Sequence, residues 1–195
     1  MRSSRSLSKA IRTYRYDLSI HGALFLSSTP EDRRAIITSY RDPNFLRAFY
    51  ARLRRNESPD HRDLREQGYE WVSHCQGEEN FLRPALDGSA IVFDDLVDGE
   101  LKYGAGSLSS RFSPSDLRVS PRTGYLFHPS PQTSRNPVSP YGPYSLLRSA
   151  LVLDHFADTL ELDANGGTFK HEGQKYAIAT LDERSDVWWR HDQKL

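Results

Sequence analysis

The alternation of apolar and polar positions near the start of the chain predicts a β-hairpin. Residues 14–20 place an apolar side chain at every second position, as in a strand with one buried face. His21-Gly22 then supplies a turn, and the apolar run 23–26 is the expected returning strand.

Two helices are expected after this hairpin. Thr29-Pro30 has the form of an N-cap followed by a first-turn proline, which predicts a helix to about Tyr40. Asp42-Pro43 repeats this start signal. The apolar face of the second helix is formed by Phe45, Leu46, Phe49, Tyr50 and Leu53. Residues 56–68 are polar and charged, so we interpret them as a loop.

The remainder of the chain is predicted to be rich in β-structure. Strands are expected at 69–72, 90–93, 101–103 and 125–127, with a weaker one at 81–82, and residues 159–181 read as a meander of short strands. Residues 144–155 form the most apolar helix candidate, although 151–153 could equally extend as a strand. We therefore predict a single α+β domain over 17–182, with a mainly antiparallel sheet and two or three packed helices.

Two further segments do not follow either periodicity. Residues 129–143 contain five prolines, which predicts an irregular surface loop or lid within the domain. Residues 183–195 are expected to form a C-terminal tail that contains Trp188 and Trp189.

Composition narrows the class of protein. The chain has 195 residues, 27% of them charged, and a mean hydropathy of −0.67. No apolar run approaches the roughly 20 residues of a transmembrane helix, so no membrane span is predicted. The single cysteine, Cys75, excludes an internal disulfide framework and indicates a reducing compartment.

The balanced net charge hides a polarity along the chain. Residues 1–55 contain twelve Arg or Lys against four acidic residues, and the remainder contains 14 basic against 22 acidic residues. Residues 1–16 have five basic groups, four serines, no acid and an apolar helical stripe, which is typical of a mitochondrial transit peptide. The alternative is an uncleaved basic arm that contacts a partner directly.

Candidate chemistry is sparse. His74-Cys75 suggests a base and a nucleophile, but adjacent residues of a strand point to opposite faces. A buried, inert Cys75 is therefore favoured, and a more distant base such as His128 stays an alternative.

No metal or cofactor site is predicted. Carboxylates at Glu78, Glu79, Asp94 and Asp95 could bind a divalent cation, but no loop spacing specifies such a site, and solvated turn carboxylates are favoured. Residues 104–106 (Gly-Ala-Gly) are too few for a phosphate loop, and no Walker motif, nucleophile elbow or dinucleotide fingerprint occurs.

Five segments nevertheless form a familiar series. The first is Tyr14-Arg15-Tyr16 with residues 22–26, and the second runs from residues 42–46 through Phe49 to Arg52-Leu53-Arg54 and Asn56. The third is Cys75-x-x-Glu78-x-Asn80-Phe81-Leu82-Arg83, followed by residues 91–93. The fourth is Gly124-x-Leu126-Phe127-His128-Pro129, and the fifth is residues 147–151. In this order they resemble uncharacterised protein family 598, also described as domain of unknown function 4505, over roughly residues 13–155. The 129–143 stretch and the Trp188-Trp189 tail depart from the family pattern.

The resemblance implies a eukaryotic protein associated with mitochondria and supplies no reaction. The polar residues that match the family pattern form the candidate functional cluster: Cys75, Glu78, Asn80, Arg83, His128 and Arg148. The alternative interpretation is that Glu78, Asn80 and Arg83 satisfy backbone groups in a tight turn.

The expected function is that of a non-catalytic accessory protein or subunit of a larger assembly in the mitochondrial matrix. The expected contacts with a protein partner are Arg47, Arg52, Arg54 and Arg55 on the basic helix face, together with Trp188 and Trp189. One alternative is a small mitochondrial enzyme or ligand-binding protein with a pocket around Cys75, Glu78, Arg83 and His128. A second is an RNA-contacting protein that uses the basic N-terminal half, with Tyr14, Tyr16 and Tyr50 as stacking groups.

Overall fold

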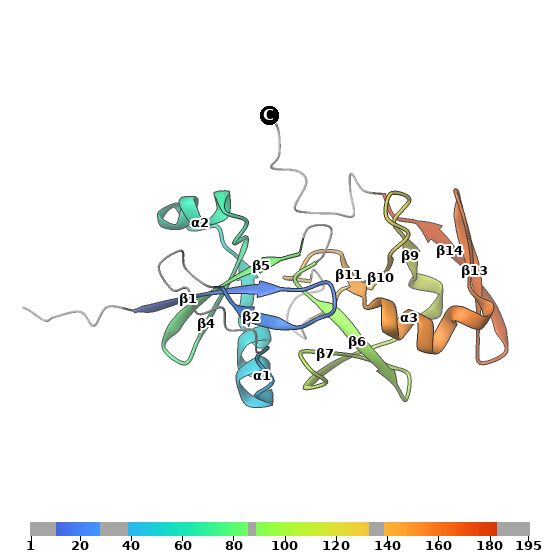
Figure 1. Ribbon diagram of the computed structural model, residues 1–195, viewed down its shortest axis with the longest axis horizontal. Helices are drawn as coiled ribbons and strands as arrows, with labels where there is room; N and C mark the ends of the chain where they lie inside the picture. The colour runs from blue at the N-terminus through green and yellow to red at the C-terminus, as the bar shows by residue number, and fades with distance from the viewer. Residues whose placement is uncertain (1–10, 28–38, 86–88, 133–138, 183–195) are drawn as a thin grey trace, which may run out of the picture.

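The fold consists of two mixed, mostly antiparallel sheets that follow one another along the chain (Figure 1). The computed structural model describes residues 11–27, 39–85, 89–132 and 139–182. Within these ranges there are three α-helices, two beside the first sheet and one beside the second. The predicted α+β class is confirmed, with two sheets where one was expected.

The N-terminal sheet has five strands in the order β2-β1-β5-β4-β3. Its strands are β1 (Arg12–Leu18), β2 (Leu24–Leu26), β3 (Leu53–Arg55), β4 (Trp71–Cys75) and β5 (Glu78–Pro84). β1 runs parallel to β5, and the other pairs are antiparallel. The predicted hairpin is confirmed as β1 and β2, and Gly22 in its turn has a φ of 81°, which favours glycine.

Helix α1 (Pro43–Ala51) covers one face of this sheet. The Asp42 carboxylate accepts hydrogen bonds from the Asn44 and Phe45 backbone amides, and Pro43 occupies the first turn, as predicted. The buried face of α1 consists of Phe45, Leu46, Phe49 and Tyr50. Leu53, which was expected to continue this face, instead belongs to β3, where it pairs with Ser73.

The C-terminal sheet has nine strands in the order β12-β13-β14-β9-β10-β11-β6-β7-β8. They are β6 (Val92–Val97), β7 (Glu100–Tyr103), β8 (Leu108–Arg111), β9 (Arg118–Val119), β10 (Leu126–Pro129), β11 (Tyr144–Leu147), β12 (Glu161–Asp163), β13 (Gly166–His171) and β14 (Gln174–Thr180). Helix α3 (Ser149–Phe156) packs against β6 and β13. The predicted C-terminal meander is confirmed as β12, β13 and β14.

Three sequence expectations are corrected by the structure. The predicted helix over 144–155 begins with β11, which lies between β10 and β6, and only then continues as α3. A strand paired on both sides has the same continuous apolar run as a buried helix, so the sequence pattern did not distinguish them. The predicted loop 56–68 contains a 3₁₀ turn at Pro59–His61 and helix α2 (Arg62–Glu66). The weak strand 81–82 is the centre of the seven-residue β5.

Some expectations fall on residues outside the described ranges. These are residues 1–10 of the predicted arm or targeting segment 1–16, most of the predicted helix 29–40, the middle of the proline-rich loop 129–143, and the tail 183–195. At the edge of the predicted helix, Tyr40 forms a β-bridge with Leu24 instead of ending a helix. The described ends of the proline-rich loop are joined by hydrogen bonds from the Ser130 amide to the Pro143 carbonyl and from the Ser139 hydroxyl to the Pro131 carbonyl.

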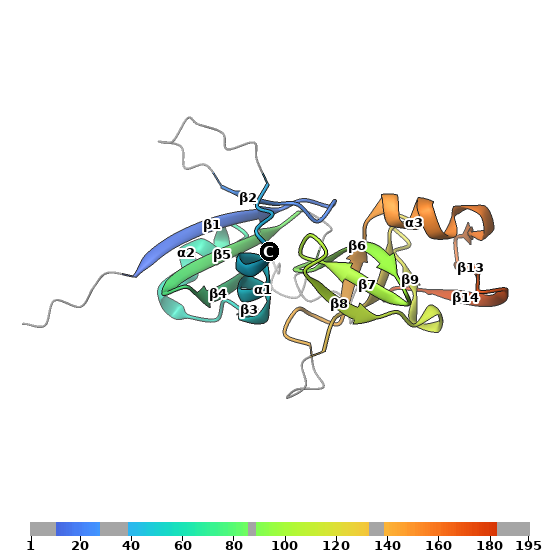
Figure 2. The same ribbon diagram turned by 90° about the horizontal axis from the view of Figure 1, so that it is seen from below.

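A continuous core joins the two sheets, which lie end to end along the long axis (Figure 2). It runs from Leu24, Phe49 and Leu82 to Phe93 and Phe156. A second, smaller cluster contains Tyr69, Val72 and Phe81, with Leu64 of α2 packed against it. The N-terminal sheet is therefore covered by α1 on one face and by the α2 segment on the other. No helix among the described residues has the length and apolar character needed to cross a membrane.

Replacing the centre of the α1 face should destabilise the whole fold. Phe49 is fully buried, and its ring lies 5.7 Å from that of Tyr16 in β1. We expect Phe49→Ala to lower the free energy of unfolding by about 3–5 kcal/mol, measured by urea denaturation, because the cavity is lined from both elements. Leu153→Ala on α3, where the side chain is 66% exposed, is the control and should change it by less than about 0.5 kcal/mol. A Phe49→Ala effect as small as that of the control would contradict this packing.

Candidate functional site

The candidate cluster derived from the sequence is distributed over several places in the structure. Cys75, Glu78 and Asn80 lie together where β4 turns into β5, and Arg83 lies at the other end of β5. His128 is in β10 of the C-terminal sheet, and Arg148 directly precedes α3. The pocket expected around Cys75, Glu78, Arg83 and His128 is therefore not formed by these residues.

Cys75 is buried, as predicted, and its environment is that of a packed thiol. Burial raises the pKa of this thiol above its ordinary value. The Asn80 side-chain amide lies 3.4 Å from Cys75 Sγ and also contacts the Ser73 and Glu78 carbonyl oxygens. His74 is exposed, and its Nδ1 lies 3.9 Å from Glu79 Oε1. The contacts of Asn80 fit the alternative in which it satisfies backbone groups at the turn.

Arg83 and His128 are both engaged in internal contacts. Arg83 Nε donates to Asp17 Oδ1 at 2.7 Å, and its guanidinium stacks over the Tyr69 ring at 4.9 Å. His128 Nε2 accepts from the Ser113 amide at 3.0 Å, and Nδ1 donates to the Pro129 carbonyl at 3.0 Å. Burial lowers the pKa of His128, so the ring is neutral near pH 7. With both nitrogens occupied, His128 is placed as a structural residue.

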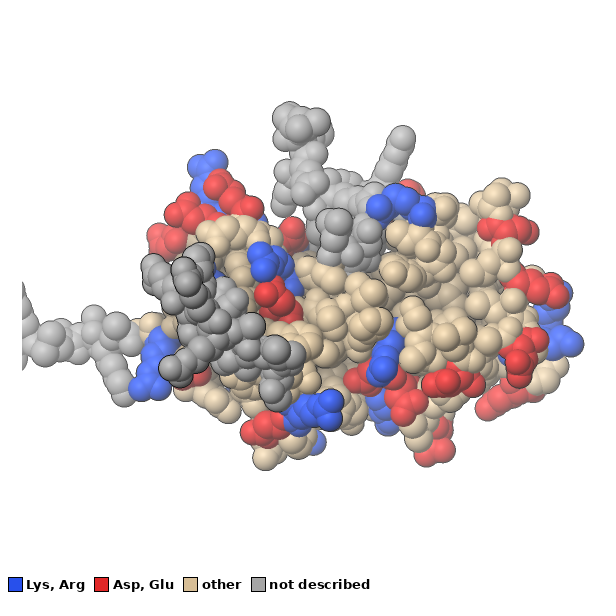
Figure 3. Space-filling view, viewed as in Figure 1, with Lys and Arg blue, Asp and Glu red and all other residues tan. Residues whose placement is uncertain are grey.

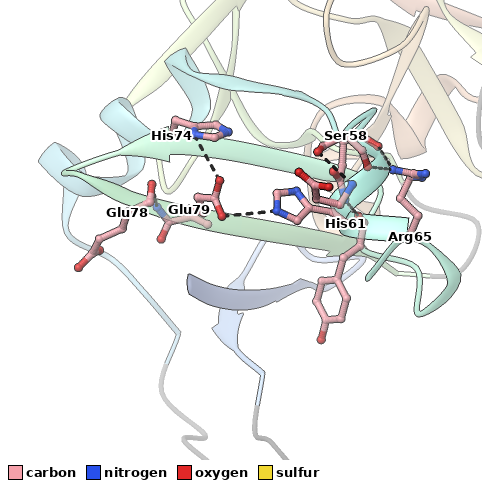
Figure 4. A network of polar contacts seen from close by, with 10 residues as sticks. Ser58, His61, Arg65, His74, Glu78 and Glu79 are labelled. Carbon is pink, nitrogen blue, oxygen red and sulfur yellow. Dashed lines mark hydrogen bonds and ion pairs between the residues drawn. The ribbon is translucent and has the colours of Figure 1, made fainter. Parts of the chain in front are cut away.

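A polar network ties the α2 segment to the N-terminal sheet (Figure 4). Glu79 lies between two histidines: His61 Nε2 is 3.6 Å from Oε2, and His74 Nδ1 is 3.9 Å from Oε1. His61 also packs edge-on against Phe81, and the Arg65 guanidinium donates to the Ser58 carbonyl. Among the described residues, no group of three or more His, Cys, Asp and Glu side chains is arranged to hold a metal ion.

The predicted partner-contact arginines divide into two kinds. Arg47 on α1, Arg52 between α1 and β3, and Arg54 on β3 are exposed. Arg55 instead donates to Glu70 Oε2 at 2.6 Å and lies over the Trp71 ring at 4.8 Å, so it holds β3 against β4. Trp188 and Trp189 lie outside the described residues. Over the C-terminal sheet most of the face in Figure 3 is uncharged, and acidic side chains are more prominent there than basic ones.

A different polar group lies where α1 meets the C-terminal sheet, and sequence reasoning did not assemble it. Asp94 is the extra residue of a β-bulge, because Phe93 pairs with Tyr103 while Asp95 already pairs with Lys102. Bulges redirect side chains and are common beside functional sites. The Asp94 carboxyl group forms a hydrogen bond with the Ala105 backbone and interacts electrostatically with Arg148.

The turn that holds Asp94 has an unusual backbone. Gly104, Ala105 and Gly106 all have positive φ, and Ala105 at 54° adopts a conformation that costs a non-glycine residue energy. A Cβ atom at Gly104 would lie 3.1–3.2 Å from the Tyr50 ring of α1. Tyr103, the residue before this turn, packs edge-on against Tyr50 at 5.8 Å, and the Tyr141 hydroxyl donates to the Tyr50 carbonyl at 2.8 Å.

We call Asp94, Arg148, Tyr50, Tyr103 and Tyr141, with the 104–106 turn, the junction site. Burial raises the pKa of Asp94, partly opposed by the Ala105 hydrogen bond and by Arg148. Asp94 Oδ1 and Arg148 Nε are both buried without a hydrogen-bond partner among the described residues. The sequence shows Asp94 only as a carboxylate beside Asp95, and nothing in its pattern indicates the bulge that separates the two.

Cys75 should be protected from alkylation in the folded protein. Reaction requires a thiolate, and both the burial of Cys75 and its raised pKa disfavour one. We expect iodoacetamide at pH 7.5 to modify native Cys75 at least about a hundredfold more slowly than in urea-unfolded protein, followed by mass spectrometry. Modification of the native protein at the unfolded rate would instead indicate a reactive thiolate.

Asp94→Asn should stabilise the protein near neutral pH. The pKa of Asp94 is raised in the folded state, so ionisation at pH 7 costs stability, and a neutral amide of the same shape removes that cost. As pH falls through the raised pKa, the folded wild type takes up its proton and the advantage of the variant shrinks. Thermal unfolding at pH 7.5 and near pH 4.5 measures both effects. Asp98→Asn, at an exposed position of the next turn, is the matched control and should show neither. Destabilisation by Asp94→Asn at pH 7.5 would contradict this account.

Comparison with known proteins gives a family. A solved structure of a DUF1285 family protein from Silicibacter pomeroyi DSS-3 is similar to this chain, with a TM-score of 0.43 and 15% sequence identity. The match covers 90% of this chain and 86% of that one. A model of the family described as domain of unknown function (DUF4505) matches residues 3–182. Since that match spans most of the 195 residues and agrees with the five resembling segments, the chain belongs to the DUF4505 family.

Proposed function

We propose that this protein acts by binding a protein partner, as a non-catalytic accessory protein or subunit of a larger assembly in the mitochondrial matrix. The observation that carries the proposal is the exposed arginine face formed by Arg47, Arg52 and Arg54. None of the three forms an ion pair with a described residue, and Arg52 donates only to the Ala48 carbonyl of its own helix. Arginine is enriched at protein interfaces, where its guanidinium pairs with carboxylates.

The position of this face supports the proposal. β3 is the terminal strand of the N-terminal sheet, so one of its edges is not paired within that sheet. Charged residues on an edge strand oppose nonspecific pairing and leave the edge to a complementary partner. Arg54 lies on this edge strand, and Arg47 and Arg52 lie on or directly after the helix that precedes it.

The internal contacts of the other polar residues favour binding over catalysis. Cys75, Arg83 and His128 are each engaged within the fold and do not share one site. The proposed mitochondrial location rests on the sequence of residues 1–16 and on the resemblance to a mitochondrial family.

Reversing the charge of the arginine face should release the protein from its assembly. We expect the wild type in mitochondrial extract to sediment with a large particle, and Arg47→Glu/Arg52→Glu/Arg54→Glu to sediment as a free 22.3 kDa chain. The matched control, Arg111→Glu/Lys170→Glu/Lys175→Glu, makes the same charge change at exposed positions of the C-terminal sheet and should stay with the particle.

Circular dichroism establishes that both triple variants are folded. A wild type that sediments alone, or an arginine-face variant that stays with the particle, would refute the proposal. Loss of the particle after ribonuclease treatment would instead favour the RNA-contacting alternative.

A further inference from the structure

The junction site combines two opposite charges that do not form a direct ion pair. Asp94 and Arg148 are close enough to interact electrostatically, yet they form no salt bridge with each other or with any other described residue. Each keeps one buried polar atom without a partner, Oδ1 of Asp94 and Nε of Arg148. Buried polar atoms are usually paired, so two such atoms on adjacent, oppositely charged groups point to a ligand that would pair with both.

The backbone around these groups is built to hold them in place. The β-bulge places Asp94 against the Ala105 amide, and the Arg148 amide donates to the Phe93 carbonyl at 2.9 Å. The helix α3 therefore begins beside β6, and its N-terminus has no side-chain cap. Free backbone amides at a helix N-terminus favour a negatively charged group at the same end as Arg148.

Aromatic groups complete the site. The side chains of Tyr50 and Tyr103 are both buried, and their rings pack edge-on with centroids 5.8 Å apart. Of these two residues, Tyr50 interacts electrostatically with Asp94. The Tyr50 phenol therefore lies near the Asp94 carboxyl group, and a phenol oxygen can accept a hydrogen bond from an ammonium group.

We propose that the junction site binds a small zwitterion, a free α-amino acid, with its ammonium group at Asp94 and its carboxylate at Arg148. An ammonium group donates three hydrogen bonds, enough for Asp94 Oδ1 and the Tyr50 phenol oxygen. A carboxylate accepts from a guanidinium and from helix N-terminal amides. A zwitterion pairs both protein charges at once, whereas a simple cation or anion leaves one of them buried and unpaired. The proposal goes beyond the proposed partner binding and does not depend on it.

Thermal unfolding with matched probes tests the proposal. The probes are the twenty free L-amino acids as one mixture, the corresponding α-carboxamides, and the corresponding N-acetyl derivatives. We expect only the free amino acids to raise the melting temperature of the wild type, because binding to the native state alone stabilises it. The active amino acid is then identified by testing the members singly, and its affinity is measured by calorimetry.

Variants identify the site. Asp94→Asn and Arg148→Gln should each weaken binding at least about tenfold. Asp98→Asn and Arg111→Gln, which remove one charge of the same sign at exposed positions, should leave it unchanged. Asp94→Asn keeps the side-chain shape, so loss of binding by this variant is separable from unfolding. No shift with the complete mixture, equal shifts with the amides or acetyl derivatives, or undiminished binding by both junction variants would overturn the proposal.

Discussion

The aromatic face of α1 is the contact on which both sheets depend. Phe45 and Phe49 pack against Tyr16 of β1, and Tyr50 on the same helix packs against Tyr103 of β7. Two further contacts join the sheets: the Tyr141 hydroxyl bonds the Tyr50 carbonyl, and the Gly22 turn lies against Val92. Because a nine-residue helix has little intrinsic stability, α1 is held by this burial, and the sheets are in turn held together through it.

The same arrangement explains why the polar residues of the resembling segments do not form one site. Cys75 and Asn80 belong to the face of the N-terminal sheet that is buried under α1, where the Ser73 hydroxyl also donates to the Phe49 carbonyl. Arg83 donates to Asp17 and lies over the Tyr69 ring, in another part of the molecule from Cys75. His128 lies within the second sheet. Each satisfies a local requirement of packing, and the two sheets keep them apart.

Local signals in the sequence predicted those elements that are determined by neighbouring residues. Asp42-Pro43 predicted the start of α1 because capping needs only adjacent groups, and the alternation over 14–20 predicted β1 because one face of that strand is buried. β11 was missed because its apolar run reflects two partner strands distant in sequence. The junction site was missed for the same reason. The bulge at Asp94 is defined by the pairing of β6 with β7, and the pairing of β6 with β11 is what brings Arg148 near Asp94.

The junction site also carries a cost that packing alone does not require. Burial makes ionisation of the Asp94 carboxyl group less favourable in the fold than in water, and Ala105, whose backbone bonds to that group, has a positive φ that costs a non-glycine residue energy. An asparagine at 94 and a glycine at 105 would remove both costs with small changes of shape. A buried charge and a strained backbone lower stability, and a simpler side chain would relieve both. Such costs are found more often at binding and active sites than elsewhere in a fold.

Since Tyr50 lies on the buried side of α1 and Arg47 on its exposed side, a single short helix supports both the junction site and the proposed partner surface. A partner that displaced α1 would therefore also move Tyr50, the residue that packs against the Gly104 turn.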